Sequence, residues 1–414
     1  MVGKPAWSPT ARPGKLDSVN RFREENEQMD AHGRVVRFTV RITVAVAASS
    51  LLGVAAIGTA SAGQRADQVR DAVRELVSPG GFPGAVAYFR TGGTTRRLGA
   101  GVADLATGEP ATPGLRFRIA SNTKSFVATV LLQLAGEGEV SLDDSIERWL
   151  PGTVRGPGYT PSEITLRMLL NHTSGLHDPD EAELFEPYFA GNRGYVYEPS
   201  EVIRRSLLTR PAFDPGQGVA YSNTGYLLLG QVIEKVTHHD VRAEIQRRLV
   251  RPLGLTRTSF PRHDPVLHGP HLHGYGMTGQ DLTTFSPSYD WTAGAMVSTV
   301  DDLATFHRAL LGGKLLKPAQ QAELTRLVPN GQGYGGYGAG IETIDFGCPD
   351  GSTQTMWGNT GAGPGFYSVS MSSADGSRQL VLAANVFDLE RESKGNPATM
   401  PRSTLPVGVA ALCR

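Results

Sequence analysis

The sequence predicts an α/β protein in which an antiparallel sheet is flanked by helices and an all-helical domain is inserted into the sheet-forming chain. Strand-like segments occur towards both ends, helical patterns dominate the middle, and 50 glycines and 27 prolines provide for many turns. We therefore assign residues 63–139 and 286–414 to the α/β domain and residues 140–285 to the helical insert.

The first elements expected are a helix, a hairpin and a second helix. Residues 66–79 carry apolar side chains at near-helical spacing, which predicts an amphipathic helix. The strand-like runs Gly84–Phe89 and Arg96–Ala103 flank the turn signal at 91–93 and predict a hairpin. An apolar segment that is broken by glycines predicts a buried helix starting near Ser121.

The middle and the end of the chain differ in pattern. Helical stretches alternate with loops in the middle, at Ile164–Leu170, Pro199–Leu208, Tyr226–Thr237 and Val241–Arg251. A helix is expected over Val300–Leu311, and strands follow it at Tyr337–Ile344, Gln354–Gly358, Gly365–Ser372 and Gln379–Asn385.

The N-terminal 62 residues are typical of an exported protein. Residues 34–62 combine arginines, an uncharged apolar run from Ile42 and a small-residue end at 60–62, which predicts a secretory signal peptide cleaved after Ala62. The alternative is an uncleaved membrane anchor, because about 20 apolar residues can span a bilayer. Residues 1–33 are polar and are either a disordered tail or a mis-assigned start, for example with Met29 as the true one.

Composition and cysteine content indicate which partners and cross-links the protein has. The 40 basic and 40 acidic residues balance, so nothing predicts a nucleic-acid partner. In the oxidising compartment implied by export, Cys348 and Cys413 predict one disulfide that ties the C-terminus to the last third of the chain. They lack the spacing of a metal site.

The first candidate catalytic segment is Ser121-Asn122-Thr123-Lys124. A serine and a lysine three residues apart at a helix N-terminus lie one turn apart on one face, so the lysine nitrogen can reach the hydroxyl. A lysine acts as a base only when burial or a nearby cation lowers its pKa. On its own this spacing is common, and its position at the start of a buried helix is what makes it a candidate.

Two later segments complete a candidate site. Tyr221 and Asn223 would point the same way in an extended segment, placing a proton-transferring phenol beside an amide. The alternative is an ordinary turn capped by Ser222. In residues 357–363 a hydroxyl precedes glycine, and the N–H of Ala362 could form an oxyanion hole with that of Ser121. The alternative here is a glycine-rich turn between strands.

These three segments, in this order, resemble the motifs of the penicillin-recognising serine hydrolases. That family includes class C β-lactamases, D-alanyl-D-alanine carboxypeptidases and related esterases. The runs ITLRMLLNHTSGL (164–176) and WTAGAMVSTVDDLATF (291–306) are also similar, and the resemblance covers residues 68–413. It implies a β-lactamase/transpeptidase-like fold. It is greatest to the secreted bacterial D-Ala-D-Ala carboxypeptidases, in which a cysteine before the third motif pairs with one near the C-terminus.

The resemblance assigns a role to each matching residue. Ser121 corresponds to the nucleophile, Lys124 to its partner and Tyr221 to the general acid and base. The substrate-binding positions are Asn223, Asn359, Thr360, Gly361, Ala362 and, by a looser match, Trp291.

The chain departs from the family pattern at two places. Asn359 stands where the family has lysine or histidine, which should weaken attraction to a substrate carboxylate and raise the pKa of Tyr221. The arginine that binds a carboxylate in the carboxypeptidases is also missing, since Ile341, Glu342 and Thr343 lie near its position.

Other polar clusters are interpreted as structural. The histidines at 263, 268, 271 and 273 and the acids Asp264 and Asp281 lack the spacing of a metal site. We interpret the run 172–175 as a turn and the pair Asp143-Asp144 as helix capping.

Together these features predict a secreted serine hydrolase that works through an acyl-enzyme on a peptide-like, ester or amide substrate. A D-Ala-D-Ala carboxypeptidase-like activity is favoured; a β-lactamase or esterase is the alternative within the family. A non-catalytic peptidoglycan-binding protein is the alternative of another class. The expected ligands are a small molecule or a peptidoglycan peptide, with β-lactams as acylating ligands. We expect a monomer without a cofactor or metal.

Overall fold

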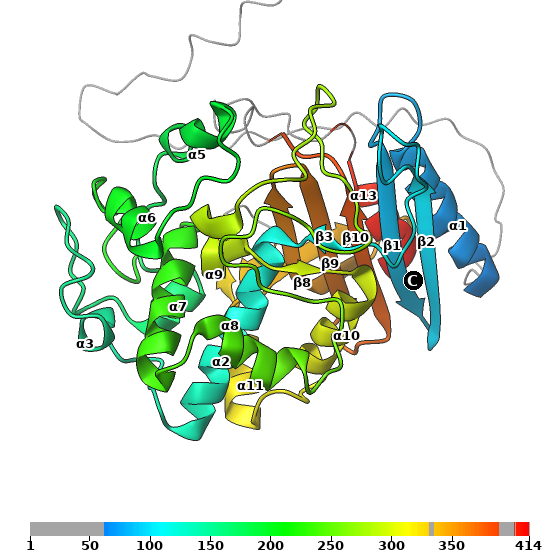
Figure 1. Cartoon of the computed structure of the whole chain (residues 1–414). Helices are drawn as coiled ribbons and strands as arrows, with labels where there is room; N and C mark the ends of the chain where they lie inside the picture. Colours follow the sequence, from blue (N-terminus) through cyan, green and yellow to red (C-terminus); the bar gives the residue numbers. More distant parts are fainter. Residues whose placement is uncertain (1–61, 331–334, 389–400, 402, 414) are drawn as a thin grey trace, which may run out of the picture. The chain divides into compact units, whose positions relative to one another are not determined.

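The computed structural model describes residues 62–330, 335–388, 401 and 403–413 (Figure 1). The tail expected over 1–33 and the signal peptide expected over 34–62 lie outside these residues, except that helix α1 begins at Ala62. No helix within the described ranges has the length and apolar character needed to cross a membrane.

An eight-stranded antiparallel sheet forms the centre of the fold. Its strand order is β2-β1-β10-β9-β8-β7-β6-β5. The first two strands are β1 (Gly84–Thr91) and β2 (Thr94–Gly101), and the others are β5 (Val328–Pro329), β6 (Gly336–Tyr337), β7 (Glu342–Gly347), β8 (Thr353–Gly363), β9 (Phe366–Ser373) and β10 (Arg378–Ala384). The sheet thus takes its strands from both ends of the described chain, and β1 pairs directly with β10. This confirms the predicted fold class.

Both faces of the sheet are covered by helices, as alternation along β1 shows. Ala85, Ala87 and Phe89 belong to a core with α1 (Ala62–Leu76) and α13 (Leu405–Leu412). Val86 and Tyr88 belong to the other core, which includes α2 (Thr123–Glu137) and α10 (Val300–Leu311). Because successive strand residues point to opposite faces, one strand contributes to both cores.

Residues 140–285, all of which are described, contribute helices but no strand. The helices are α3 (Ile146–Trp149), α4 (Leu166–Leu170), α5 (Glu181–Phe189), α6 (Pro199–Ser206), α7 (Asn223–Thr237) and α8 (Val241–Ile245), which continues as the π-helical turn η2 (Gln246–Val250). Each of the four predicted helical stretches contains a helix, whereas α3 and α5 were not predicted. The exact limits of the two domains stay a prediction.

Several predicted strand boundaries were wrong. The predicted strand Tyr337–Ile344 is divided, because Gly340 has a φ of 78° and turns the chain between β6 and β7. A side chain at Gly340 would meet the Ala128 side chain of α2 at 2.2 Å, so the turn packs tightly on that helix. The predicted strand Gln354–Gly358 extends to Gly363 as β8, so the third motif is a strand and not a turn.

The remaining short elements lie around the start of α2. They are β3 (Phe117–Arg118), the 3-10 turn η1 (Ala120–Asn122), η3 (Pro287–Tyr289), α9 (Trp291–Gly294) and β4 (Val297–Ser298), with α11 (Pro318–Leu324) further along. The predicted disulfide is present: Cys348 and Cys413 have Cα atoms 5.6 Å apart, and the bond joins the end of β7 to the residue after α13.

Candidate active site

Ser121 lies in the turn η1, immediately before α2, and not in the α-helix itself. The preceding residue, Ala120, adopts a left-handed conformation with a φ of 44°, which is uncommon for a residue with a side chain. Lys124 follows in the first turn of α2, and its Nζ donates a hydrogen bond to Ser121 Oγ at 3.0 Å. The predicted contact between these two side chains is therefore present.

Lys124 is almost completely buried, with 2% of its surface exposed. Besides Ser121, its Nζ donates to Asn223 Oδ1 at 2.7 Å and to the Ala293 carbonyl oxygen at 2.9 Å. Burial lowers the pKa of Lys124 to about 8, although nearby carboxylates, first that of Asp290, act in the opposite direction. The neutral amine is thus accessible close to physiological pH.

Tyr221 approaches Ser121 from the segment before α7. Although 42% of the residue is exposed, its hydroxyl donates a hydrogen bond to Ser121 Oγ at 2.8 Å. Burial of the hydroxyl raises the pKa of Tyr221 well above its usual value, and the bond to Ser121 only partly offsets this. Burial is the main cause of the raised pKa and Asn359 does not contribute to it, so the expectation drawn from Asn359 stays a prediction. The raised pKa keeps Tyr221 a phenol in the free protein.

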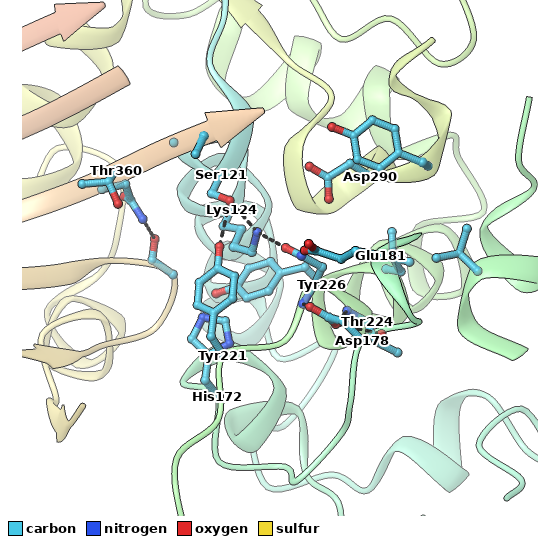
Figure 2. Close-up of a pocket in the computed structure, with 18 of the residues that line it drawn as sticks. Ser121, Lys124, His172, Asp178, Glu181, Tyr221, Thr224, Tyr226, Asp290 and Thr360 are labelled. Atoms are coloured by element: carbon cyan, nitrogen blue, oxygen red, sulfur yellow. Dashed lines mark hydrogen bonds between the residues drawn. The ribbon is translucent and has the colours of Figure 1, made fainter. Parts of the chain in front are cut away.

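His172 supports Tyr221 from below (Figure 2). The two rings are tilted against each other with centroids 4.4 Å apart, and His172 Nδ1 accepts a hydrogen bond from the backbone N–H of Ser222 at 3.2 Å. Burial, together with the charge of Lys124, lowers the pKa of His172 to about 3, so the imidazole is neutral. The run 172–175 is a turn as predicted, with positive φ at His172 and Gly175, but its histidine also lines the active-site cavity.

Asp178 anchors the segment that carries Tyr221 and Asn223, and sequence reasoning did not find it. Its carboxylate accepts hydrogen bonds from the Ser222 hydroxyl, the Asn223 backbone N–H, and both the N–H and the hydroxyl of Thr224, at 2.8–3.1 Å. Ser222 also caps α7, because its Oγ accepts from the N–H of Gly225. Ser222 therefore caps α7 as the alternative predicted, while its neighbours Tyr221 and Asn223 contact Ser121 and Lys124.

The third motif lies on β8 opposite the start of α2. A Cβ atom at Gly361 would lie 2.2 Å from the carbonyl oxygen of Ile119, so only glycine lets the strand approach this closely. Asn359 is buried, and its Nδ2 donates to the Gly340 carbonyl oxygen at 3.1 Å. Thr360 and Ala362 line the active-site cavity, where Ala362 is exposed.

Trp291 is not brought into the site. Its side chain is 2% exposed and packs on α7, where a Cβ atom at Gly230 would meet the Trp291 ring at 2.8 Å. The two residues before it, Tyr289 and Asp290, line the cavity instead. The aromatic side chain that lines the cavity is therefore Tyr289, two residues before the predicted Trp291.

The cavity around Ser121 has a volume of about 360 Å³ and a strongly acidic lining. Four carboxylates, those of Asp178, Glu181, Asp290 and Glu342, line it together with a single cation, Lys124. The lining also has an apolar and aromatic part, which includes Leu184, Phe185, Val202, Leu227 and Tyr289. None of the lining residues is an arginine.

The histidine-rich loop lies elsewhere and forms pairs with acids. His268 Nε2 lies 2.6 Å from Asp264, and His273 Nδ1 lies 3.3 Å from Asp281. Within the described part of the chain, no group of three or more histidine, cysteine or acidic side chains could hold a metal ion. The pair Asp143-Asp144 does not cap a helix as predicted, because Ser145 is the N-cap of α3. Asp144 instead accepts from the Trp149 indole and the Ser141 N–H.

The model of the family described as Beta-lactamase matches residues 69–400, which include every segment of the site. The chain belongs to the β-lactamase family. The chain is thus a serine hydrolase of the β-lactamase and penicillin-binding protein group.

Solved structures similar to this β-lactamase-family chain include amide-hydrolysing enzymes. A D-stereospecific amidohydrolase from Streptomyces sp. is 34% identical with a TM-score of 0.74, and the match covers 84% of this chain and 98% of that one. The D-amino acid amidase from Ochrobactrum anthropi SV3, complexed with L-phenylalanine amide, is 28% identical with a TM-score of 0.68, covering 78% and 91%.

The similar curated proteins are less complete matches. Protein flp of Staphylococcus aureus (strain COL) is 27% identical over 246 residues, which is 57% of this chain and only 47% of that protein. Putative penicillin-binding protein PbpX of Bacillus subtilis (strain 168) is 26% identical over 309 residues, or 74% and 71%. A fold relative from Pyrococcus abyssi, 24% identical with a TM-score of 0.67 over 82% of this chain and 79% of that one, is an octameric penicillin-binding protein homologue. The expectation of a monomer for this chain stays a prediction.

Proposed function

We propose that this serine hydrolase cleaves small amides and short peptides whose acyl group is a D-amino acid with a free α-ammonium group and an apolar side chain. The observation that carries the proposal is the charge of the cavity: four carboxylates and no arginine surround the nucleophile. An ammonium group is favoured there, whereas a substrate carboxylate would find no cation except the catalytic lysine.

Asp290 is the residue best placed to receive the ammonium group. It lines the cavity but is only 9% exposed, and no hydrogen-bond donor among the described residues acts on its carboxylate. Burial raises the pKa of Asp290 to about 6, so the group is ionised at neutral pH without a direct partner. A bound ammonium would provide that partner and recover part of the cost of burying the charge.

The apolar lining next to Asp290 would receive the side chain of the acyl group. Leu184 and Phe185 from α5, with Tyr289, lie on this side of the cavity. Ligand sites commonly combine such an apolar wall with a few orienting polar groups. The D configuration is supported by the similarity to the D-stereospecific amidohydrolase from Streptomyces sp. and the D-amino acid amidase from Ochrobactrum anthropi.

The reaction follows from the contacts at Ser121. Neutral Lys124 takes the proton of the Ser121 hydroxyl while Oγ bonds to the carbonyl carbon, and the backbone N–H groups of Ser121 and Ala362 bind the oxyanion. Tyr221 donates its proton to the leaving nitrogen, the C–N bond breaks, and the Lys124 ammonium returns a proton to Tyr221. Water then attacks the ester carbon and gives one proton back to Ser121, which releases the amino acid.

The D-Ala-D-Ala carboxypeptidase activity favoured by the sequence is the second candidate. It rests on the family resemblance and on the match to a putative penicillin-binding protein. Its substrate ends in a carboxylate, and the acidic lining, with Asn359 in the third motif, offers that group no cationic partner. We therefore rank it below the amide-hydrolysing activity.

The test compares three substrates with the wild-type protein and the Ser121→Ala variant. We expect ammonia release from D-phenylalanine amide, at least about 100-fold less from the L-enantiomer, and none with Ser121→Ala. Cleavage of an N-acylated peptide ending in D-Ala-D-Ala, without cleavage of the amide, would establish the carboxypeptidase instead. If no substrate is cleaved and intact-protein mass spectrometry detects no benzylpenicillin adduct, the proposed hydrolysis is refuted and the non-catalytic peptidoglycan-binding alternative is favoured.

A further inference from the structure

Glu342 holds Thr360 of the third motif by two hydrogen bonds. Its Oε1 accepts from the Thr360 backbone N–H at 2.6 Å and from the Thr360 hydroxyl at 2.7 Å. Glu342 in β7 pairs with Gly358 in β8, so Glu342 and Thr360 lie on the same face of the sheet and both line the active-site cavity.

This contact determines which hydrogen-bonding groups the end of the cavity formed by Glu342 and Thr360 presents to a ligand. A hydroxyl has one donor and two acceptor lone pairs, and the donor of Thr360 is taken by Glu342. Asn359 turns its amide nitrogen away, towards the Gly340 carbonyl oxygen. Acceptor atoms and the carboxylate of Glu342 therefore dominate this part of the cavity. Burial raises the pKa of Glu342, while the hydrogen bonds from Thr360 and the charge of Lys124 favour its ionised form.

The same end receives the leaving group if the proposed function holds. Tyr221 must reach the leaving nitrogen to protonate it, so the leaving group lies near Tyr221. The ring centroid of Tyr221 is 6.1 Å from that of Tyr337. Tyr337 in β6 pairs with Glu342 in β7, so Tyr221 and Glu342 lie in the same part of the cavity. Thr360 and Asp290 lie on opposite sides of Ser121 (Figure 2). With the acyl group bound towards Asp290, the leaving group points towards Thr360 and Glu342.

We propose that Glu342 and Thr360 form a specificity element that accepts neutral, hydrogen-donating leaving groups, such as a carboxamide or an amine, and rejects those ending in a free carboxylate. The inference rests on the proposed function and adds the leaving-group side to it. Because like charges opposed across a binding site disfavour the complex, a dipeptide with a free C-terminus is a poor substrate. The amide of the same dipeptide is a good one.

A matched substrate pair tests this without any mutation. D-Phe-D-Ala and D-Phe-D-Ala amide share the scissile bond and differ only at the group expected to face Glu342, so release of D-Phe is measured for both. We expect kcat/KM to be about 100-fold higher for the amide. A ratio near one, a preference for the free acid, or cleavage of neither dipeptide by a protein that does hydrolyse D-phenylalanine amide would overturn the inference. Failure on D-phenylalanine amide as well would instead refute the proposed function.

A variant then assigns the preference to Glu342. Glu342→Gln removes the charge but keeps an oxygen that can accept from Thr360, and it should reduce the ratio at least about 10-fold, mainly through better cleavage of the free acid. Asp345→Asn is the matched control, because Asp345 accepts from the Thr355 hydroxyl at 2.7 Å in the same strand pair but does not line the cavity. An equal change of the ratio in both variants, or none in Glu342→Gln, would show that Glu342 does not select the leaving group.

Discussion

Gly361 and Ile119 approach so closely that the third motif and the turn holding Ser121 behave as one unit. A Cβ atom at Gly361 would lie 2.2 Å from the Ile119 carbonyl oxygen and 3.0 Å from the Asn122 amide nitrogen. The two N–H groups that we propose as the oxyanion hole lie close to this contact: Ala362 directly follows Gly361, and Ser121 comes two residues after Ile119. Their separation is therefore set by a contact that leaves no room for a methyl group.

Gly361→Ala should separate β8 from η1 and reduce kcat. Removing a well-placed oxyanion donor costs about 100–1,000-fold in kcat, and we expect a loss in this range with a smaller effect on KM. Steady-state kinetics on D-phenylalanine amide measure it. Gly347→Ala in β7 is the control, because no atom lies within 4 Å of its added Cβ; equal losses in the two variants would contradict the explanation.

The pH dependence of acylation should reflect Lys124. Its pKa is lowered from 10.5 to about 8 in the folded protein, and only the neutral amine can take the proton from Ser121. We expect kcat/KM to rise about tenfold per pH unit below pH 8 and to level off above it. p-Nitrophenyl acetate is the suitable substrate because it does not titrate, and Ser121→Ala provides the background rate. A flat profile from pH 6 to 9 would exclude Lys124 as the base.

Asp290→Asn should stabilise the protein at alkaline pH while impairing the proposed reaction. Burial raises the pKa of Asp290 from 3.8 to about 6, so the folded state binds this proton more tightly than the unfolded state does. The carboxyl group therefore costs stability as pH rises from about 4 to 6. We expect a free energy of unfolding about 1–3 kcal/mol higher for the variant at pH 8, and little difference at pH 4, in urea titrations.

An aspartate with the opposite shift provides the control for Asp290. Hydrogen bonds from Ser373 and Ser377 lower the pKa of Asp375 to about 2, so its ionised form is favoured in the folded protein. Asp375→Asn should therefore destabilise the protein at pH 8. If both variants changed stability in the same direction, the assignment of the Asp290 effect to burial would be wrong.

Asp178→Ala should lower both stability and kcat. It removes the acceptor of four hydrogen bonds at the start of α7, so the segment bearing Tyr221 and Asn223 loses its anchor. We expect a loss of about 2–4 kcal/mol in the free energy of unfolding and a kcat reduced about 10–100-fold. Asp240→Ala, which uncaps α8 outside the active-site cavity, should lower stability with kcat retained. A normal kcat in Asp178→Ala would show that the anchor is dispensable.

Much of the fold could be predicted because its elements have strong local signals. The hairpin β1–β2 was found from two strand-like runs and a double-glycine turn, in which Gly92 and Gly93 both have positive φ. Helix α5 was not predicted because it is short, has acidic residues in its first turn and contains Pro187, so its apolar spacing is weak. It packs through Leu184 and Phe185. The division of β6 from β7 was missed because the turn at Gly340 is imposed by contact with α2.

The sequence by itself determined the chemical groups at the nucleophile. A spacing of three residues at the start of α2 predicts Lys124 beside Ser121, and the shared orientation of Tyr221 and Asn223 predicts that these two side chains lie together. That both segments belong to one site followed from the family resemblance. Only the tertiary structure decided which charges surround them. Asp178, Asp290 and Glu342 come from separate loops and a strand, and no local pattern indicates that they meet around one cavity. Substrate preference depends on that long-range convergence, because the field at Ser121 is the sum of charges brought together by folding.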